Sequence, residues 1–378
     1  MKVVVVSGVW PPDVGGPATH APELCDFLLG RGHCVEAVTT ASVAPERQAY
    51  AIHWTSRRLP IGVRHAVAAM RIERAANGAD VVYSTGMLGR SSAGAAAARV
   101  PVVAKLTSDP VFERSLRWRL FSGDLASLQR AHGRRIALLR RVRDLELARA
   151  VRVVVPSEAL RVLALAWGVP AEKVTVIRNP VAVPRDLEER EALRVRHGMA
   201  GPTLVYAGRL APQKSVDTAL AAVSRVDGVS LVVAGDGAER DRLRRQAARL
   251  GLDGRIRFLG ALPRHEVFEL LRAADASILT STWENFPHVV VESLAVGTPV
   301  LATDVGGVRE AVRDDENGLL VPARDAAALA DAIRRFVGDP DLQARLRGNA
   351  SASLGGGLEL ENVYGELEEV LVSAALLR

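Results

Sequence analysis

The sequence is poor in cysteine, lysine and long apolar runs. Its 378 residues contain two cysteines, Cys25 and Cys34, with no CxxC pair and no histidine cluster. This argues against a structural zinc site and favours a reducing compartment. No stretch approaches the roughly 18 apolar residues of a membrane span, and the N-terminal "VVVV" is too short for a signal peptide. We therefore expect a cytoplasmic chain, with or without membrane association. Its hydrophobic content of 48% is sufficient for a large core.

Lysine is scarce although the chain is basic. Of its 49 lysines and arginines, only four are lysines (Lys2, Lys105, Lys173 and Lys214), so 45 are arginines. The net charge is +6 and the pI about 9.8. Codon usage in a GC-rich genome would explain the arginine excess, so we expect no nucleic-acid partner. Where such a chain keeps a lysine, a compact point charge is favoured over a planar guanidinium. This singles out Lys105 and Lys214.

Short apolar runs alternate with helix-like segments along the whole chain. The runs are rich in Val, Ile and Leu without alternation, which predicts strands buried on both faces of parallel sheets, and thus an α/β fold. The expected strands are 2–7, 34–39, 79–83, 101–105, 151–155, 174–177, 203–207, 229–234, 255–259, 275–280, 299–303 and 318–321.

The length favours two domains. Three prolines and a charged stretch interrupt the alternation at 178–202, and we expect the linker at 178–185. The predicted domains are 1–180 and 181–357. After "LGGG" at 354–357, a helix-like segment at 358–377 is expected to cross back, so that 358–378 packs on the first domain.

Residues 112–150 are dense in arginine and amphipathic. One hypothesis is a weak peripheral contact with an anionic membrane surface or a charged acceptor. The alternative is a solvated helix face covered by the stems of its arginines.

Glycine turns follow two of the predicted strands. In "PPDVGGP", Gly15 and Gly16 precede a helix, where backbone amides could meet an anion or simply form a tight turn. In the second half, "AGRLAPQKS" places Gly208, Arg209 and Lys214 at the carboxyl end of a strand, where open α/β sheets bind ligands. Two cations there suit a diphosphate, although solvated loop residues are the alternative. Another glycine turn follows at Gly235 and Gly237.

Two glutamates flank a helix start in "WENFPHVVVESLAVGTP". Pro287 suits the first helical position, and Gly297 with Pro299 ends the helix. Glu292 lies in an apolar helix and needs donors, because a buried, unpaired carboxylate is costly. Ribose hydroxyls would supply them, whereas a neighbouring arginine is the structural alternative. A glycosidase would also use two carboxylates, but it needs no cations for a diphosphate.

These motifs resemble the retaining glycosyltransferases of family 4, of bacterial type, which have the GT-B fold. The resemblance covers nearly the whole chain and is strongest at 203–330, in "YAGRLAPQKSVD", "VVAGDG", "STWENFPHVVVESLAVGTPVLATDVGGVREAV" and "NGLLVPARD". The first half is less similar, in "PPDVGG" and "LLGRGHCVEAVTT". Glu284 and Glu292 match the family's E-x7-E pair. The expected architecture is two Rossmann-like domains facing a cleft, the first binding the acceptor and the second the donor.

The resemblance implies roles for these residues. The Gly16 amide would reach the diphosphate, and Arg209 and Lys214 would neutralise it. Glu292 would accept the ribose hydroxyls, and Glu284 would contact the donor sugar. The resemblance thus implies a donor site made of Gly16, Gly208, Arg209, Lys214, Gly235, Leu259, Glu284, Asn285, Phe286, Pro287 and Glu292, with the base near Leu259 and Gly260.

One part of the first half departs from the family. After the strand at 101–105, where many members carry a histidine, this chain reads "LTSDP" with Ser108 and Asp109. Asp109 is therefore a candidate catalytic residue beside Arg209, Lys214 and Glu284. Either Asp109 or Lys105 would take over the sugar contacts, or His132 or His20 would do so from elsewhere, although we expect His20 to be a capped or surface histidine. The acceptor-side candidates are Asp13, His20, Lys105, Ser108 and Asp109.

No metal or other cofactor is expected. Asp339 and Asp341 form the D-x-D sequence, but "VGDPDL" is typical of a helix start, with Asp as cap and Pro in the first turn. The leading hypothesis is transfer of a hexosyl sugar from a nucleoside-diphosphate sugar, UDP favoured and GDP the second choice. The acceptor would be a hydroxyl-bearing small molecule, lipid or saccharide. Alternatives are a catalytically altered nucleotide-sugar-binding protein, or an epimerase or phosphorylase on the same fold.

Overall fold

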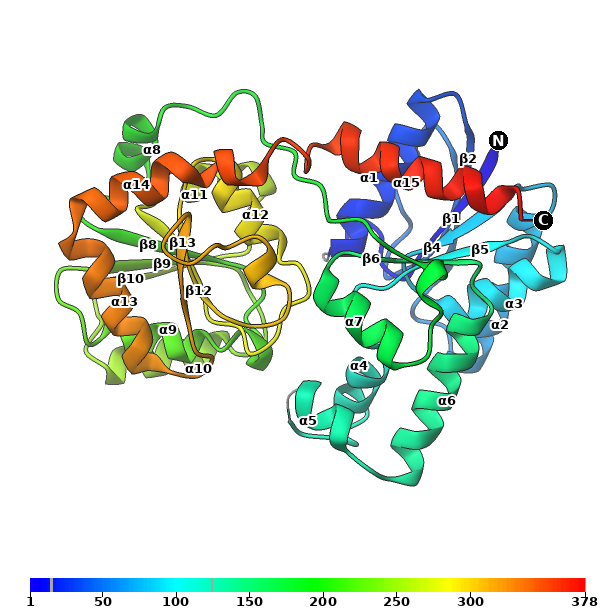
Figure 1. The fold of residues 1–378 in the computed structure, drawn as a ribbon, viewed down its shortest axis with the longest axis horizontal. Coiled ribbons are helices and arrows are strands. Elements are labelled where there is room, and N and C mark those ends of the chain that lie inside the picture. Colours follow the sequence, from blue (N-terminus) through cyan, green and yellow to red (C-terminus); the bar gives the residue numbers. More distant parts are fainter. Residues whose placement is uncertain (14–15, 124, 378) are drawn as a thin grey trace. The chain divides into compact units, whose positions relative to one another are not determined.

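The computed structural model describes residues 1–13, 16–123 and 125–377 (Figure 1). By their internal contacts these residues form two compact units, residues 1–178 with 361–378 and residues 179–360. Each unit has its own sheet and its own core.

The described part of the first unit contains a seven-stranded parallel sheet in the order β3-β2-β1-β4-β5-β6-β7. Its strands are β1 Lys2–Ser7, β2 Cys34–Ala41, β3 Ala51–Ser56, β4 Val81–Ser84, β5 Val102–Lys105, β6 Arg152–Val155 and β7 Val174–Val176. The apolar runs do not predict β3, "AIHWTS", because this edge strand is partly exposed and carries a histidine and a threonine.

Helices cover both faces of this sheet. They are α1 Gly16–Gly30, α2 Ile61–Ala76, α3 Leu88–Ala98, α4 Pro110–Arg117, α5 Leu125–Arg130, α6 Arg134–Ala148, α7 Glu158–Ala166 and α15 Leu360–Ala375. Val4 and Val6 of β1 share a core cluster with Ile72 of α2. The expected return of the C-terminal helix is confirmed, since the Tyr364 ring lies 5.4 Å from that of His20 and 5.6 Å from that of Phe27.

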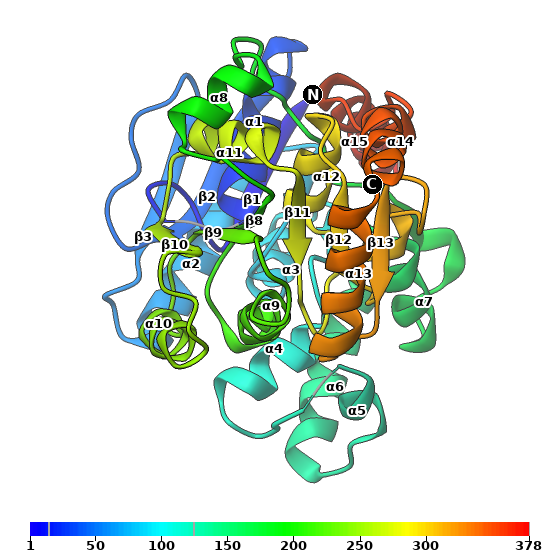
Figure 2. The same cartoon turned by 90° about the vertical axis from the view of Figure 1, so that its left-hand side faces the viewer.

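The second unit contains a six-stranded parallel sheet in the order β10-β9-β8-β11-β12-β13 (Figure 2). Its strands are β8 Thr203–Ala207, β9 Ser230–Ala234, β10 Ile256–Gly260, β11 Ala276–Leu279, β12 Val300–Thr303 and β13 Gly318–Val321. Its helices are α8 Arg190–Arg196, α9 Val216–Val223, α10 Arg240–Arg249, α11 Arg264–Ala273, α12 His288–Ala295, α13 Ala326–Gly338 and α14 Pro340–Ala350.

Alternate residues of the central strands β8 and β9 enter two different cores in this unit. Leu204 and Tyr206 of β8 pack in a cluster with residues of α9, α10 and α13, whereas Val205 and Ala207 pack with residues of α8 and α11. The continuous apolar runs therefore mark strands that are buried on both faces, as predicted.

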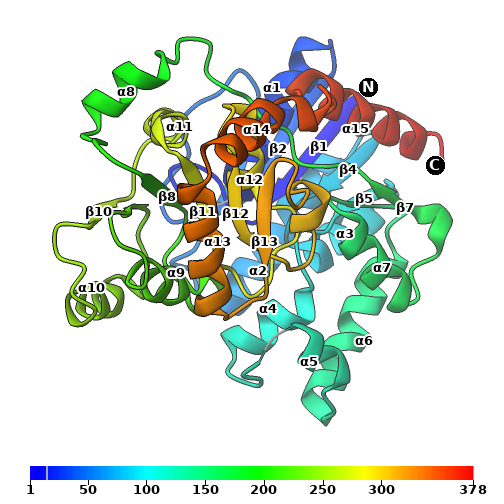
Figure 3. The same cartoon turned by 60° about the vertical axis from the view of Figure 1, so that its left-hand side comes forward.

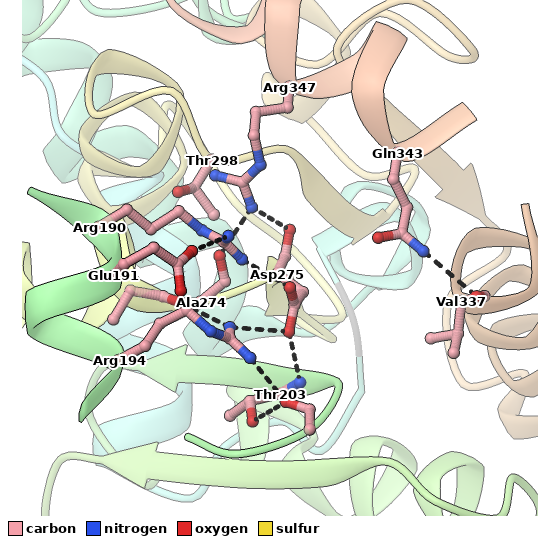
Figure 4. A network of polar contacts seen from close by, with 12 residues as sticks. Arg190, Glu191, Arg194, Thr203, Ala274, Asp275, Thr298, Val337, Gln343 and Arg347 are labelled. Atoms are coloured by element: carbon pink, nitrogen blue, oxygen red, sulfur yellow. Dashed lines mark hydrogen bonds and ion pairs between the residues drawn. The ribbon is translucent and has the colours of Figure 1, made fainter. Parts of the chain in front are cut away.

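Asp275 joins several elements at the amino end of this sheet (Figure 4). Its carboxylate accepts hydrogen bonds from Arg190 (2.6 Å) and Arg194 (3.1 Å) of α8 and from the Thr203 backbone amide (2.7 Å). Arg347 of α14 donates to the backbone carbonyls of Ala274 and Asp275 at 2.8 and 2.9 Å. Burial lowers the pKa of Arg347 to about 10. One carboxylate thus fixes α8 to the starts of β8 and β11.

We expect Asp275→Asn to lower the free energy of unfolding by about 3 kcal/mol, because two arginines lose their charged partner in a largely buried site. The matched control is Asp331→Asn, whose partner Arg334 is exposed, and its change should stay within about 0.5 kcal/mol. Urea denaturation of both variants measures the difference. Equal losses would contradict the assignment of Asp275 as the connecting residue.

Candidate functional site

Five loops meet at the carboxyl end of the second sheet and are hydrogen-bonded to one another. The loops after β8 and β9 are joined by the Leu210 amide, which donates to the Asp236 carbonyl at 2.9 Å. The Gly235 amide donates at 2.6 Å to the carbonyl of Gly260, the last residue of β10. The loop after β11 is joined to that after β8 by the Thr282 amide, which donates to the Gln213 carbonyl at 2.8 Å. The fifth loop follows β12, where the Gly307 amide donates to the Glu284 carbonyl at 3.2 Å.

Glycine is required where these loops approach most closely. Gly235 has φ +144° and Gly306 has φ +52°. A Cβ atom at Gly235 would lie 1.8 Å from the Gly208 carbonyl oxygen, and one at Gly306 would lie 1.8 Å from the Glu284 carbonyl oxygen. A side chain at either position would therefore separate two loops of the site.

Lys214 and Glu284 are brought together by this arrangement. Lys214 ends a short 3-10 turn, Pro212–Lys214, and its ammonium donates to the Glu284 carboxylate. Glu284 is 7% exposed, and Ser281 donates to the same carboxylate oxygen at 2.5 Å. Thr280 also donates to the Lys214 backbone carbonyl at 2.9 Å. The carboxylate is thus buried and satisfied by a cation and a hydroxyl.

Arg209 lies on the same turn as Lys214. Its side chain is exposed, and among the described residues it has no hydrogen-bond or ion-pair partner. The Arg209 carbonyl accepts from the Tyr206 hydroxyl at 3.0 Å. Burial raises the pKa of Tyr206, the Glu284 charge raises it further and Arg209 opposes the change. The charges of Glu284 and Arg209 therefore both lie close to Tyr206, near the end of β8.

Glu292 lies on α12 with its side chain 13% exposed, and Arg264 of α11 lies 3.3 Å from its carboxylate. This ion pair is the structural alternative that the sequence left open. Pro287 caps α12 and precedes its first residue, so the expectation that it is the first helical residue is wrong by one position.

Of the other predicted donor residues, Gly208, Asn285 and Phe286 lie on these loops, and Leu259 lies near the end of β10. Asn285 and Phe286 are 8% and 3% exposed, and the Phe286 carbonyl accepts from Asn179 at 3.2 Å. Gly208 follows β8 directly, whereas Leu259 of β10 is 39% exposed. The second-unit residues predicted for the donor thus share one edge of one sheet.

In the first unit, Lys105 ends β5 and its side chain is buried. Its side chain is 6% exposed, and its ammonium forms no hydrogen bond among the described residues. The Thr85 hydroxyl is also buried and has no hydrogen-bond partner in the described part of the chain. Ser84 of β4 pairs with Ala104 of β5. Thr85 directly follows Ser84 in the chain, and Lys105 directly follows Ala104. Burial lowers the pKa of Lys105 to about 7.

The structure gives Asp109 internal partners, and its catalytic or sugar-contacting role stays a prediction. This residue is fully buried and caps α4, where it accepts from the Val111 amide at 2.8 Å and from Gln129 at 3.0 Å. Arg143 lies 3.7 Å from its carboxylate. Both carboxylate oxygens therefore stabilise the protein itself. Ser108 donates to Glu113 and is 7% exposed.

His20 is neither a surface residue nor a cap, so that expectation is wrong. It is 6% exposed on α1, and its ring is 2.7 Å from the Tyr83 hydroxyl and 3.3 Å from that of Tyr364. These contacts indicate a packing role between α1 and α15 and argue against contact with the acceptor.

The glycine turn is only partly described. Asp13 pairs with Arg57 at 3.3 Å, and Gly16 is the exposed first residue of α1. Gly15 lies outside the described residues. His132 is exposed.

Among the described residues there is no group of three or more histidine, cysteine or acidic side chains that could hold a metal ion. Asp339 caps α14 by accepting from the Leu342 amide at 2.9 Å, with Pro340 in the first turn, as predicted for the D-x-D sequence.

Comparison with known families covers most of the chain. The family described as "Glycosyltransferase Family 4" matches residues 14–185, and the one described as "Glycosyl transferases group 1" matches residues 189–353. The chain belongs to glycosyltransferase family 4. This family includes retaining hexosyltransferases such as glycogen synthase.

Curated relatives are similar to this chain over part of their length. The lipopolysaccharide core biosynthesis glycosyltransferase LpsE of Rhizobium meliloti is 34% identical over 218 residues, which is 58% of this chain and 62% of LpsE. The glycogen synthase of Mycobacterium tuberculosis is 33% identical over 213 residues, 55% of this chain and 50% of the synthase. The alignments therefore span half to about three fifths of these relatives.

Solved structures show that the fold is GT-B. Anabaena HepE (Alr3699), crystallised in complex with UDP and glucose, superposes with a TM-score of 0.82 at 22% identity, over 99% of this chain and 100% of HepE. The sucrose-phosphate synthase of Thermosynechococcus elongatus gives a TM-score of 0.82 at 20% identity, with 100% of both chains covered. Two Rossmann-like sheets and a C-terminal helix match these structures.

Two residues of the site were not singled out from the sequence. Ser281 holds the Glu284 carboxylate, and Gly306 allows the loop after β12 to approach it. The pair "GG" at 306–307 was a signal for the second, because consecutive glycines after a strand indicate a close backbone approach. Ser281 had no such signal.

We expect Gly306→Ala to destabilise the second unit by more than about 1 kcal/mol, because the new Cβ would collide with the Glu284 carbonyl. The matched control is Gly201→Ala, where the Cβ would meet nothing within 4 Å. Thermal unfolding compares the two. A Gly306→Ala protein as stable as the control would contradict the close approach.

Lys105 predicts a pH dependence of stability. Its pKa falls from 10.5 to about 7 on folding, so between these values the unfolded chain binds more protons and stability rises with pH, by at most about 1.4 kcal/mol per unit. Lys105→Met removes this contribution, and its gain over the wild type should be largest at pH 7 and below and shrink toward pH 10. Urea denaturation at pH 7, 8 and 9 tests this, and a constant difference between the two proteins would refute it.

Proposed function

We propose that this chain transfers a hexosyl group from a nucleoside-diphosphate sugar, with UDP as the favoured nucleotide, to a hydroxyl acceptor with retention of anomeric configuration. The observation that carries the proposal is the turn after β8. It presents Arg209 and Lys214 together, and Lys214 pairs with the buried Glu284 of the loop after β11.

The two cations suit the diphosphate of the donor. Arg209 is exposed and unpartnered among the described residues, so its guanidinium is available for two phosphate oxygens. Lys214 would exchange part of its contact with Glu284 for a phosphate. Positive charge placed there stabilises the negative charge that develops on the departing diphosphate, which lowers the barrier.

The glutamates would hold the two ends of the donor. Glu292 would accept the ribose hydroxyls, and in the free protein Arg264 lies 3.3 Å from its carboxylate. Glu284 would contact the sugar hydroxyls, with the backbone of Asn285, Phe286 and Pro287 nearby. Leu259 would pack against the base, since its side chain is partly exposed.

The reaction needs no base from the protein. The acceptor oxygen forms a bond to the anomeric carbon on the face from which the phosphate departs. The bond between carbon and phosphate oxygen breaks, its electron pair leaves with the nucleoside diphosphate, and a phosphate oxygen takes the acceptor proton. This agrees with the burial of Asp109, whose carboxylate has internal partners.

UDP is favoured because this chain is similar in fold to a protein crystallised with a UDP-sugar. HepE, whose fold this chain shares, has been crystallised in complex with UDP-glucose. The acceptor would be a small molecule, a lipid or a saccharide that bears a hydroxyl group.

A second function is a nucleotide-sugar-binding protein without transfer. The observation that favours it lies in the first unit, where Asp109 and His20 are both occupied by internal contacts. This protein would bind the donor through the same second-unit residues.

Thermal shift with UDP-, GDP-, dTDP- and ADP-sugars tests donor binding, because a ligand that binds only the native state raises its melting temperature. We expect the largest shift with a UDP-sugar. Glu292→Gln should weaken its binding about 10-fold or more, as expected for loss of hydrogen bonds to a charged group. Arg264→Gln is the control, and it should weaken binding less if Glu292 meets the ribose.

Lys214→Ala should lower kcat for transfer or donor hydrolysis about 100-fold, and Lys173→Ala is its matched control.

The outcomes of these experiments distinguish the proposed transferase from a protein that only binds the donor. Binding without transfer or hydrolysis by the wild type would favour the binding protein. Equal losses of binding for Arg264→Gln and Glu292→Gln would assign Glu292 to the ion pair alone. Unchanged binding and turnover in the Glu292 and Lys214 variants would overturn the proposed site.

A further inference from the structure

The positive charge of this chain is concentrated in one segment. Residues 112–150 contain ten arginines and four acidic residues, a net charge of +6, which equals the net charge of the whole chain. The other residues balance, with 39 basic and 39 acidic side chains. A general codon preference for arginine would spread the excess along the sequence, and so it does not explain this distribution.

Three of these arginines have structural roles. Arg143 is 3% exposed, lies 4.2 Å from the Trp167 ring centroid and bonds to Asp144. Arg114 pairs with Glu146 at 3.0 Å, and Arg140 donates to the Leu128 and Gln129 carbonyls. The other seven are exposed and have no partner among the described residues: Arg117, Arg119, Arg130, Arg134, Arg135, Arg141 and Arg149.

Apolar side chains are exposed among these arginines. On α6, Leu138, Val142 and Leu145 are 61%, 36% and 63% exposed. Their spacing of four and three places them on one face of the helix. We call this the α6 outer face.

The α6 outer face is not part of the buried core of the first unit. The opposite face of the helix, with Ile136, Leu139, Arg143 and Leu147, is the one buried in the first unit. Helices α4, α5 and α6 lie together at one end of that unit (Figure 3). The end of α4 adds Leu116 and Trp118, which are 41% and 58% exposed.

We propose that the α6 outer face, with its flanking arginines and the end of α4, binds the surface of an anionic lipid bilayer. Leucine, valine and tryptophan side chains would enter the region between headgroups and acyl chains, and the guanidinium groups would contact phosphates. A bilayer of this kind offers both an apolar layer and negative charge.

Other partners fit this surface less well. A second copy of the chain would bring two surfaces of net charge +6 together, which costs free energy at low salt. A nucleic acid would match the charge, but it would leave the aliphatic side chains of α6 without an apolar partner. The bilayer proposal is independent of the donor chemistry proposed above.

Vesicle co-sedimentation of the full chain tests the proposal. The probes are vesicles of pure phosphatidylcholine and vesicles with about 30% phosphatidylglycerol, in 50 to 300 mM NaCl. We expect binding to the anionic vesicles that weakens as salt rises. Leu138→Glu with Leu145→Glu should weaken it at least about 10-fold. Arg134→Gln, Arg135→Gln and Arg141→Gln together should weaken it about 100-fold.

Matched controls lie in the second unit. Val195→Glu changes an 83% exposed valine of α8, and the triple variant Arg225→Gln, Arg245→Gln, Arg249→Gln removes the same charge. Both should keep wild-type binding, and all variants should keep wild-type melting temperatures and UDP-sugar binding. The proposal is overturned if the wild type does not bind anionic vesicles, if the control triple loses as much binding as the α6 triple, or if Leu138→Glu with Leu145→Glu instead abolishes self-association.

Discussion

The burial of the Glu284 carboxylate is the interaction on which the loops of the second unit depend. A carboxylate that is 7% exposed must be matched by donors, and here they come from Lys214 and Ser281. To satisfy it, the loop after β8 must lie against the loop after β11. The glycines at 235 and 306 then allow the neighbouring loops to approach within hydrogen-bonding distance. The cations of the site are thereby fixed by a structural requirement as well as by their chemistry.

Much of the second unit could be predicted from its sequence. Apart from β10, which carries Arg257 and an exposed Leu259, its strands are apolar runs because both faces are buried, and charged residues follow where these strands end. Arg209, Lys214, Glu284 and Glu292 were therefore visible as a set. Ser281 and the Arg264 partner of Glu292 were not, because contacts between separate elements leave no local pattern.

The first unit was less predictable for physical reasons. Its edge strand β3 is partly exposed and so lacks the apolar signal of a buried strand. The sequence around Asp109 is that of a site residue. In the structure, however, its carboxylate caps α4 and accepts a hydrogen bond from Gln129. His20 likewise depends on Tyr364, which is 344 positions away in the sequence. Such long-range partners determine burial, and no local motif records them.

The packing of α15 on the first unit has a consequence for synthesis. Tyr364 contacts His20 and Phe27, and Glu368 binds His33 at 2.6 Å. The surface of α1 and of the turn after it that receives these groups is made early, but the helix that covers it is α15, Leu360–Ala375. The second unit, 179–360, is complete before that cover exists. On a ribosome, the half of the chain that emerges first is therefore the half that finishes folding last, and until then its α1 surface remains open to solvent and to chaperones.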